Sequence, residues 1–314
     1  MDKSNFTGQI IVTAGATYLD IDAYACSIAL AELLQLKGID AVAYSDAPCN
    51  YSVCPSLMAE SRLVTSLPQE IEEKAKYIIV DVSDPNYLKY NVPLDNIIKV
   101  YDHHVGFEEY WTSRIDDGTN IEFIGAAATL IYREWKKAGL EDKMSRSSAL
   151  LLIAAILDNT LNLTSSNTTE EDREVFKALC RKESIGEEWC AAYFFEVQKS
   201  VEADLKNAIF NDIKRITDNT LLPPRMAQLC VWDAESIIKK LPEIRLYFDG
   251  KDNWLMNIID IKHRCSYFVS DNSVCQAGLE DIFGVRFESG VARSPVPYLR
   301  KEIIKHIISK NIGG

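Results

Sequence analysis

The stretch NIIKVYDHHVGFEEYW, residues 96–111, decides how the rest of the sequence is interpreted. Residues 97–101 are mostly aliphatic or long-chained, as in a buried strand of a sheet. Three polar residues follow at once, Asp102, His103 and His104. Such a histidine pair is often an accident of the surface when it stands alone, so its meaning depends on which other residues share this edge of the sheet.

Strand-like and helix-like segments alternate through the first two thirds of the chain. We expect buried strands at 9–15, 40–46, 76–84 and 96–104, and helices at 22–38, 125–140, 145–160 and 168–180. In the last of these helices, Thr168 and Glu171 have the spacing of a capping box. The alternation predicts an α/β fold with a mostly parallel sheet and helices on both faces.

The pattern changes between residues 195 and 225. The pair Pro223–Pro224 cannot lie inside a helix, and shorter strand-like segments at 227–233, 254–261 and 264–271 follow it. We therefore expect two domains, residues 1–200 with the parallel sheet and residues 201–314 with a smaller mixed α/β structure.

The net charge, the cysteine pattern and the lengths of the apolar stretches indicate which class of protein this is. The 314 residues carry a formal net charge of −12, which argues against a surface that tracks long nucleic acid. The eight cysteines are scattered without C-x-x-C pairs, as in a reduced cytoplasmic protein. We find no signal-peptide pattern at the start, and no apolar stretch of the ~18 residues that a membrane span needs.

Acidic residues recur at the ends of the predicted strands. Asp20 and Asp22 follow the first strand, Asp81 ends the third, and Asp158 ends a helix. Any one of them alone is more often a helix cap or turn residue. Together with Asp102-His103-His104 they form an ordered set of carboxylates and imidazoles that suits Mn²⁺ or Mg²⁺. Two such ions ~3.5–4 Å apart would clamp a phosphoryl group.

The sequence resembles the DHH phosphoesterase superfamily in four motifs. These are YLDIDAYACSIAL (18–30), IIVDVSD (78–84), VYDHHVGF (100–107) and AILDNTLNLTSSNTTEED (155–172). The last motif is similar to the branch of manganese-dependent family II inorganic pyrophosphatases and prune-like exopolyphosphatases. Residues 254–284 and the segment SGVARSPVPYL (289–299) resemble the DHHA2 domain of that branch.

The resemblance implies the metal ligands. Asp20 would bind a first Mn²⁺ or Mg²⁺ ion, whereas Asp22, His103 and Asp158 would bind a second. Asp81 would bridge the two ions. The site would thus hold one or two ions, depending on how well the first is bound.

The resemblance also implies catalytic and substrate-binding residues. His104 would face the substrate as a hydrogen-bond or proton donor, and Asp102 would orient the loop or a histidine through a hydrogen bond. Arg293 would hold a phosphate oxygen with its guanidinium group.

The sequence departs from the family pattern in two places. Family II pyrophosphatases have histidine four residues before the first aspartate, and this chain has Ala16 there. The segment after Arg293 lacks the lysines of the DHHA2 loop. Both changes favour a less charged or larger substrate than pyrophosphate.

The implied function is that of a metal-dependent phosphohydrolase. It would cleave a phosphoanhydride or phosphoester bond of a small phosphorylated substrate, such as pyrophosphate or a short polyphosphate, in an interdomain cleft with metal-activated water. Two alternatives stay open: a phosphodiesterase for short or cyclic nucleotides, and a non-catalytic phosphate-binding protein that has lost one metal ligand at Ala16. We expect no long nucleic acid and no membrane as partner, and leave a homodimer open.

Overall fold

The computed structural model describes residues 9–59, 61–89, 92–216, 221–248 and 253–312. The chain divides into two compact units, Met1–Cys190 and Ala191–Gly314. Helix α8 (Glu187–Ala203) contains both the point of division and residue 200, where we expected the domain boundary.

The first unit is built on a parallel sheet with the strand order β2-β1-β3-β4-β5. The strands are β1 (Ile10–Thr13), β2 (Ala41–Ala43), β3 (Lys76–Val80), β4 (Ile97–Asp102) and β5 (Thr119–Ile121). The helices are α1 (Ile21–Leu36), α2 (Pro55–Ala59), α3 (Gln69–Lys74), α4 (Glu108–Ile115), α5 (Ala127–Ala138), α6 (Arg146–Asn159) and α7 (Glu170–Glu183). The predicted α/β class is confirmed; strand β5 and the helices α2, α3 and α4 were not predicted.

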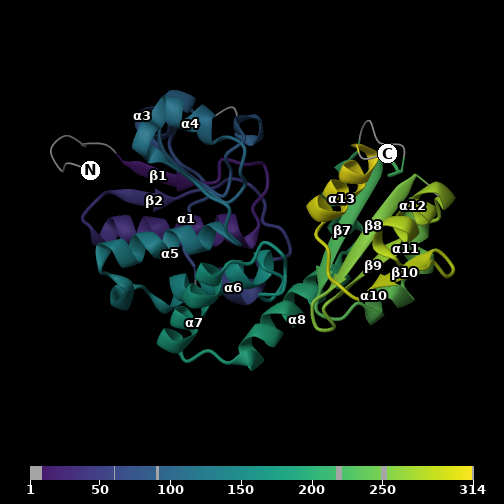
Figure 1. Cartoon of the computed structure of the whole chain (residues 1–314). Helices are drawn as coiled ribbons and strands as arrows, with labels where there is room; N and C mark the ends of the chain where they lie inside the picture. Colours follow the sequence, from purple (N-terminus) through teal and green to yellow (C-terminus); the bar gives the residue numbers. More distant parts are fainter. Residues whose placement is uncertain (1–8, 60, 90–91, 217–220, 249–252, 313–314) are drawn as a thin grey trace. The chain divides into compact units, whose positions relative to one another are not determined.

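Helices cover both faces of this sheet. Figure 1 shows α3 and α4 on one face and α1 and α5 on the other, with α6 packed against α1. Helix α1 is buried on nearly all sides because it lies between the sheet and α6. This position explains why its sequence is apolar around the whole circumference rather than along one stripe.

The parallel arrangement brings the ends of distant segments to one edge. Strands β1, β3 and β4 run in the same direction, so the residues that follow each of them emerge at the same edge of the sheet. Asp20 begins α1 after the β1 loop, Asp81 follows β3, and Asp102 ends β4. Topology alone therefore gathers three acids from distant parts of the sequence.

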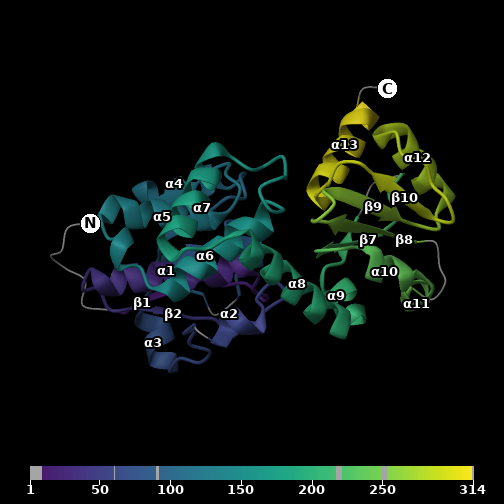
Figure 2. The ribbon, with the colours of Figure 1, turned by 90° about the horizontal axis from the view of Figure 1, so that it is seen from below.

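The second unit contains a mixed sheet with the order β10-β9-β8-β7-β6 (Figure 2). Its strands are β6 (Lys214–Arg215), β7 (Arg225–Val231), β8 (Trp254–Asp260), β9 (Cys265–Val269) and β10 (Val291–Ser294). Its helices are α9 (Leu205–Asn211), α10 (Glu235–Lys239), α11 (Leu241–Tyr247), α12 (Ser273–Phe283) and α13 (Arg300–Ile312). Residues of α12 and α13 pack on one face of the sheet around Phe268.

Within the described part of the chain, no helix has both the length and the apolar character needed to cross a membrane.

The capping box of α7 lies one residue later than predicted. Thr169, not Thr168, caps the helix, and its partner is Asp172 rather than Glu171. The reason is that Asp172 is fully buried and also accepts a hydrogen bond from the backbone N–H of Gly125. With Thr169 as the cap, the side chain of Asp172 points toward the interior of the unit.

Trp111 connects α4 to the loop after β3. Its side chain is fully buried, and its Nε1–H donates to the carbonyl of Ser83 at 2.6 Å. The Ser83 hydroxyl in turn donates to the carbonyl of His104 at 2.9 Å. One tryptophan therefore supports the loops that carry Asp81 and His104.

We predict that Trp111→Phe lowers the free energy of unfolding by about 1–3 kcal/mol, because the Ser83 carbonyl loses its donor. Trp111→Ala should cost about 3–5 kcal/mol, because it also leaves a cavity. Urea denaturation measures both, with Glu109→Gln on the exposed side of α4 as the control. A Trp111→Phe protein as stable as the wild type would contradict this assignment.

Candidate metal centre

Asp22 is buried at the start of α1 and faces the start of α5. Its Oδ2 accepts from the backbone N–H of Ala127 and its Oδ1 from that of Ala128, both at 2.8 Å. The thiol of Cys26 lies 3.3 Å from Oδ1. Burial and the negative charge of Asp20 raise the pKa of Asp22 to about 7. The carboxyl group is thus held firmly in a place where its own negative charge is unfavourable.

Asp20 and Asp81 lie beside it. Asp20 caps α1 by accepting from the backbone N–H of Ala23 at 2.9 Å. Asp81 has a φ angle of 62°, a left-handed conformation uncommon outside glycine, and it is buried. Burial and the charges of Asp20, Asp22 and Asp102 raise the pKa of Asp81 well above its usual value. Among the described residues, Asp81 Oδ1 is buried and accepts no hydrogen bond.

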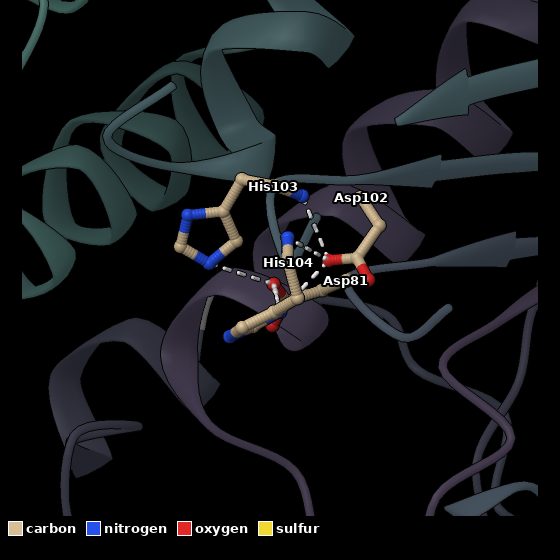
Figure 3. Close-up of side chains that lie close together, drawn as sticks. All are labelled: Asp81, Asp102, His103 and His104. Atoms are coloured by element: carbon tan, nitrogen blue, oxygen red, sulfur yellow. Dashed lines mark hydrogen bonds and ion pairs between the residues drawn. The ribbon is translucent and has the colours of Figure 1, made fainter. Parts of the chain in front are cut away.

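His103 presents one ring nitrogen to these acids. Its Nδ1 lies 3.2 Å from the carbonyl of Ile124. A carbonyl can only accept, so this contact places the ring proton on Nδ1 and leaves the lone pair on Nε2. Figure 3 shows that nitrogen facing Asp81, 3.4 Å from Oδ1; it lies 4.0 Å from Oδ2 of Asp22. Histidines that bind metals are commonly fixed in this way by a carbonyl behind the ring.

Asp102 organises the two histidines through one oxygen. Its Oδ1 accepts from the backbone N–H groups of His103 and His104, at 2.7 and 3.1 Å, and lies 2.8 Å from His104 Nδ1 (Figure 3). Burial acts to raise the pKa of Asp102, but the hydrogen bond and charge of His104 outweigh it and hold that pKa below its usual value. The His104 side chain is 57% exposed. Asp102 therefore holds a histidine that solvent can reach.

These side chains meet the chemical requirements of a hard divalent cation. Asp81, Asp102, His103 and His104 each offer a ligand atom within 4.8 Å of the others. Asp22 adjoins this group through His103, and the negative charge of Asp20 acts on Asp81. Carboxylate oxygens with imidazole nitrogens suit Mn²⁺ or Mg²⁺, and the buried oxygen of Asp81 gives such an ion a direct ligand. The residues therefore fit the predicted cofactor.

Asp158 lies outside this close group. It occupies the last turn of α6, where it is half-buried, and its assignment as a ligand stays a prediction. The three residues Leu161–Leu163 that follow the helix all have positive φ angles, of 49°, 58° and 62°. Ala16, which stands where a histidine ligand would be, is half-buried in the loop after β1.

Arg293 belongs to the second unit. It lies on β10 with an exposed side chain, opposite Tyr267 in the sheet and close to Cys265. Its contact with a phosphate oxygen stays a prediction.

A second group with ligand-type side chains occurs in the second unit: Asp233, Asp260 and His263. It differs from the first because Lys262 already forms an ion pair with Asp233 at 2.9 Å. Asp260 accepts from the backbone N–H groups of Ala234 and His263. These contacts satisfy the carboxylates locally and close the turn after β8.

Sequence reasoning missed the groups that hold the proposed ligands in place. The carbonyl of Ile124 and the N–H groups of Ala127 and Ala128 act through the backbone, so their side chains carry no signal. The acidic start of α7 was noted as a motif, yet the inward contact of Asp172 with Gly125 could not be read from it.

Comparison with known sequences finds relatives of one kind. No family model matches the chain. Three relatives are named as probable manganese-dependent inorganic pyrophosphatases. The Clostridium acetobutylicum protein is 26% identical over 203 residues, covering 65% of this chain and 64% of its own. The Deinococcus radiodurans protein is 26% identical over 162 residues, which cover 48% of its own length. The chain thus spans about half to two thirds of these two relatives.

The Listeria innocua relative extends the likeness, with 24% identity over 309 residues, which cover 92% of this chain and 94% of that protein.

Two solved structures share the fold. A Methanococcus jannaschii protein assigned to the family II inorganic pyrophosphatases has a TM-score of 0.64 at 20% identity, covering 95% of this chain and 98% of that one. An exopolyphosphatase-related protein of Bacteroides fragilis has a TM-score of 0.53 at 13% identity, covering 96% and 91%. The resemblance to the DHH phosphoesterase superfamily, in its family II pyrophosphatase branch, is therefore confirmed.

Proposed function

We propose that the protein is a metal-dependent phosphohydrolase that cleaves a phosphoanhydride or phosphoester bond of a small phosphorylated substrate. Pyrophosphate, short polyphosphates and similar compounds are the candidates, and Ala16 together with the missing lysines after Arg293 favours a less charged or larger compound than pyrophosphate. One observation carries the proposal: the buried Oδ1 of Asp81 accepts no hydrogen bond from the described residues and faces His103 Nε2 at 3.4 Å. Its neighbours Asp20 and Asp22 add negative charge that a divalent cation would neutralise.

In this proposal Asp22, Asp81 and His103 hold Mn²⁺ or Mg²⁺, with Asp20 and Asp158 completing one or two ion sites. When bound, such an ion polarises phosphoryl oxygens and water. The protein's own residues set the positions of the ligands, because Ile124 fixes the ring of His103 and α5 fixes Asp22.

His104 is the proposed donor to the substrate. Asp102 accepts from its Nδ1–H, which fixes the ring while the side chain stays exposed. A histidine held in this way can donate a hydrogen bond or a proton to a phosphate oxygen. Arg293 is the proposed guanidinium contact to a second phosphate oxygen.

We predict that Mn²⁺ raises the thermal stability of the wild type, by about 2.7 kcal/mol at an ion concentration 100 times the dissociation constant. Asp81→Asn should weaken Mn²⁺ binding by at least roughly 100-fold, since the variant loses a direct ligand. Differential scanning calorimetry measures the stability with and without Mn²⁺, and titration calorimetry measures the affinity for Mn²⁺. Asp84→Asn, in the loop after Asp81, is the control. An Asp81→Asn protein that binds Mn²⁺ like the wild type would refute the site.

We predict that His104→Gln lowers kcat by about 10²–10⁴-fold while the affinity for Mn²⁺ is retained, because a proton donor is lost but no proposed ligand is. His263→Gln is the matched control, since Asp260 contacts that ring through Nδ1 in the same way. Phosphate release is measured with the substrate that the wild type turns over fastest. Equal kcat values for His104→Gln and wild type would remove His104 from the mechanism.

A substrate panel separates the proposal from its alternatives. Release of phosphate from pyrophosphate or tripolyphosphate with Mn²⁺ supports the phosphohydrolase, whereas cleavage of short or cyclic nucleotides alone favours the phosphodiesterase. Binding of Mn²⁺ without turnover on the whole panel would support the non-catalytic protein.

A further inference from the structure

The segment between β5 and α5 supports two proposed metal ligands at once. The carbonyl of Ile124 accepts from the Nδ1–H of His103, and the N–H groups of Ala127 and Ala128 donate to Asp22. All three contacts come from five consecutive residues of backbone. The position of this segment therefore determines how far Asp22 lies from His103.

Asp172 holds this segment from the interior. Its side chain is fully buried; Oδ2 accepts from the Gly125 N–H at 2.8 Å and Oδ1 from the Thr129 hydroxyl at 2.6 Å. The same carboxylate accepts from Thr169, which caps α7. Asp172 thus connects the start of α7 to both sides of the segment that supports the ligands.

The approach of Asp172 to the segment requires a glycine. A Cβ atom at Gly125 would lie 2.5 Å from Asp172 Oδ2 and 2.6 Å from Thr160 Cγ2. Both neighbours are themselves fully buried and cannot move into solvent. A substitution at Gly125 must therefore displace the segment, the acid or both.

Asn167 links the same glycine to the end of α6. Its Nδ2 lies 3.3 Å from the carbonyl of Gly125 and 3.4 Å from that of Asn159, the residue next to Asp158. The loop before α7 therefore contacts the backbone behind His103 and the backbone beside Asp158.

We propose that Asp172 is a positioning residue that sets the metal affinity of the site, acting through Gly125 and Thr129 on the backbone that holds His103 and Asp22. This inference rests on the proposed function, because it takes Asp22 and His103 as ligands. Capping of α7 alone does not explain the contacts, since Gly125 and Thr129 both lie outside α7.

The test compares the dissociation constant for Mn²⁺ among variants, measured by electron paramagnetic resonance at a temperature where each variant is folded by circular dichroism. Asp172→Ala and Gly125→Ala should each raise the constant by about 10–100-fold, the range for partners that orient metal ligands. Thr169→Ala is the matched control. It removes the hydroxyl that caps α7 and donates to Asp172 Oδ2, but leaves the donors of Gly125, Thr129 and the Thr169 backbone on that carboxylate. It should therefore lower the melting temperature and raise the constant less than Asp172→Ala does.

A second conservative variant keeps the test valid if Asp172→Ala does not fold. Asp172→Asn retains the shape and an acceptor for Gly125, so it should bind Mn²⁺ more tightly than Gly125→Ala. Wild-type affinity in folded Asp172→Ala or Gly125→Ala would overturn the inference, as would an equal loss in Thr169→Ala.

Asp81→Asn in the same titration separates the two proposals. If only Asp81→Asn loses affinity, the positioning role fails; if Asp81→Asn also binds normally, the metal site itself fails.

Discussion

Repulsion among buried carboxylates is the constraint on which the candidate site depends. Asp22 and Asp81 are held at one edge of the sheet with Asp20 beside them, and burial together with mutual charge raises the pKa of both buried acids. Part of this cost is offset by backbone N–H groups, as at Asp22. Asp81 Oδ1 has no such donor within the described residues. A fold that tolerates this arrangement is explained most simply by a cation that completes it.

The two units show how the same chemical groups can serve different purposes. In each, an aspartate at the end of a strand contacts Nδ1 of a nearby exposed histidine: Asp102 with His104, and Asp260 with His263. The two groups differ in whether a lysine forms an ion pair with one of the acids. In the second unit Lys262 supplies a positive charge to the neighbouring acid, so the turn is electrostatically satisfied by the chain itself. Among the residues described, no lysine or arginine forms an ion pair with Asp81 or Asp102. For the first site, a cation from solution is the proposed source of that positive charge.

Much of the fold and part of the site could be predicted from the sequence. Long apolar runs such as residues 76–80 identify buried strands, and a parallel sheet necessarily places Asp20, Asp81 and Asp102 at one edge. Short or half-exposed elements such as β5 carry too little pattern to be recognised. The capping register of α7 was wrong by one residue because a tertiary contact, Gly125 with Asp172, decided between Thr168 and Thr169.

Residues with left-handed backbone conformations lie at or next to two of the proposed ligands, Asp81 and Asp158. Asp81 and the three residues Leu161–Leu163 adopt left-handed conformations, which cost roughly 1–2 kcal/mol for a residue such as leucine and less for aspartate or asparagine. Local bonds hold the second region: the N–H of Asn162 donates to Leu157, and that of Leu163 to the hydroxyl of Thr160. Such conformations persist where surrounding structure imposes them, and they concentrate at functional sites. The left-handed residues lie directly after β3 and just beyond the end of α6. Asp81 therefore follows β3 immediately, and Asp158 lies in the last turn of α6. The backbone conformations that set where these two acids lie therefore come at a cost in stability.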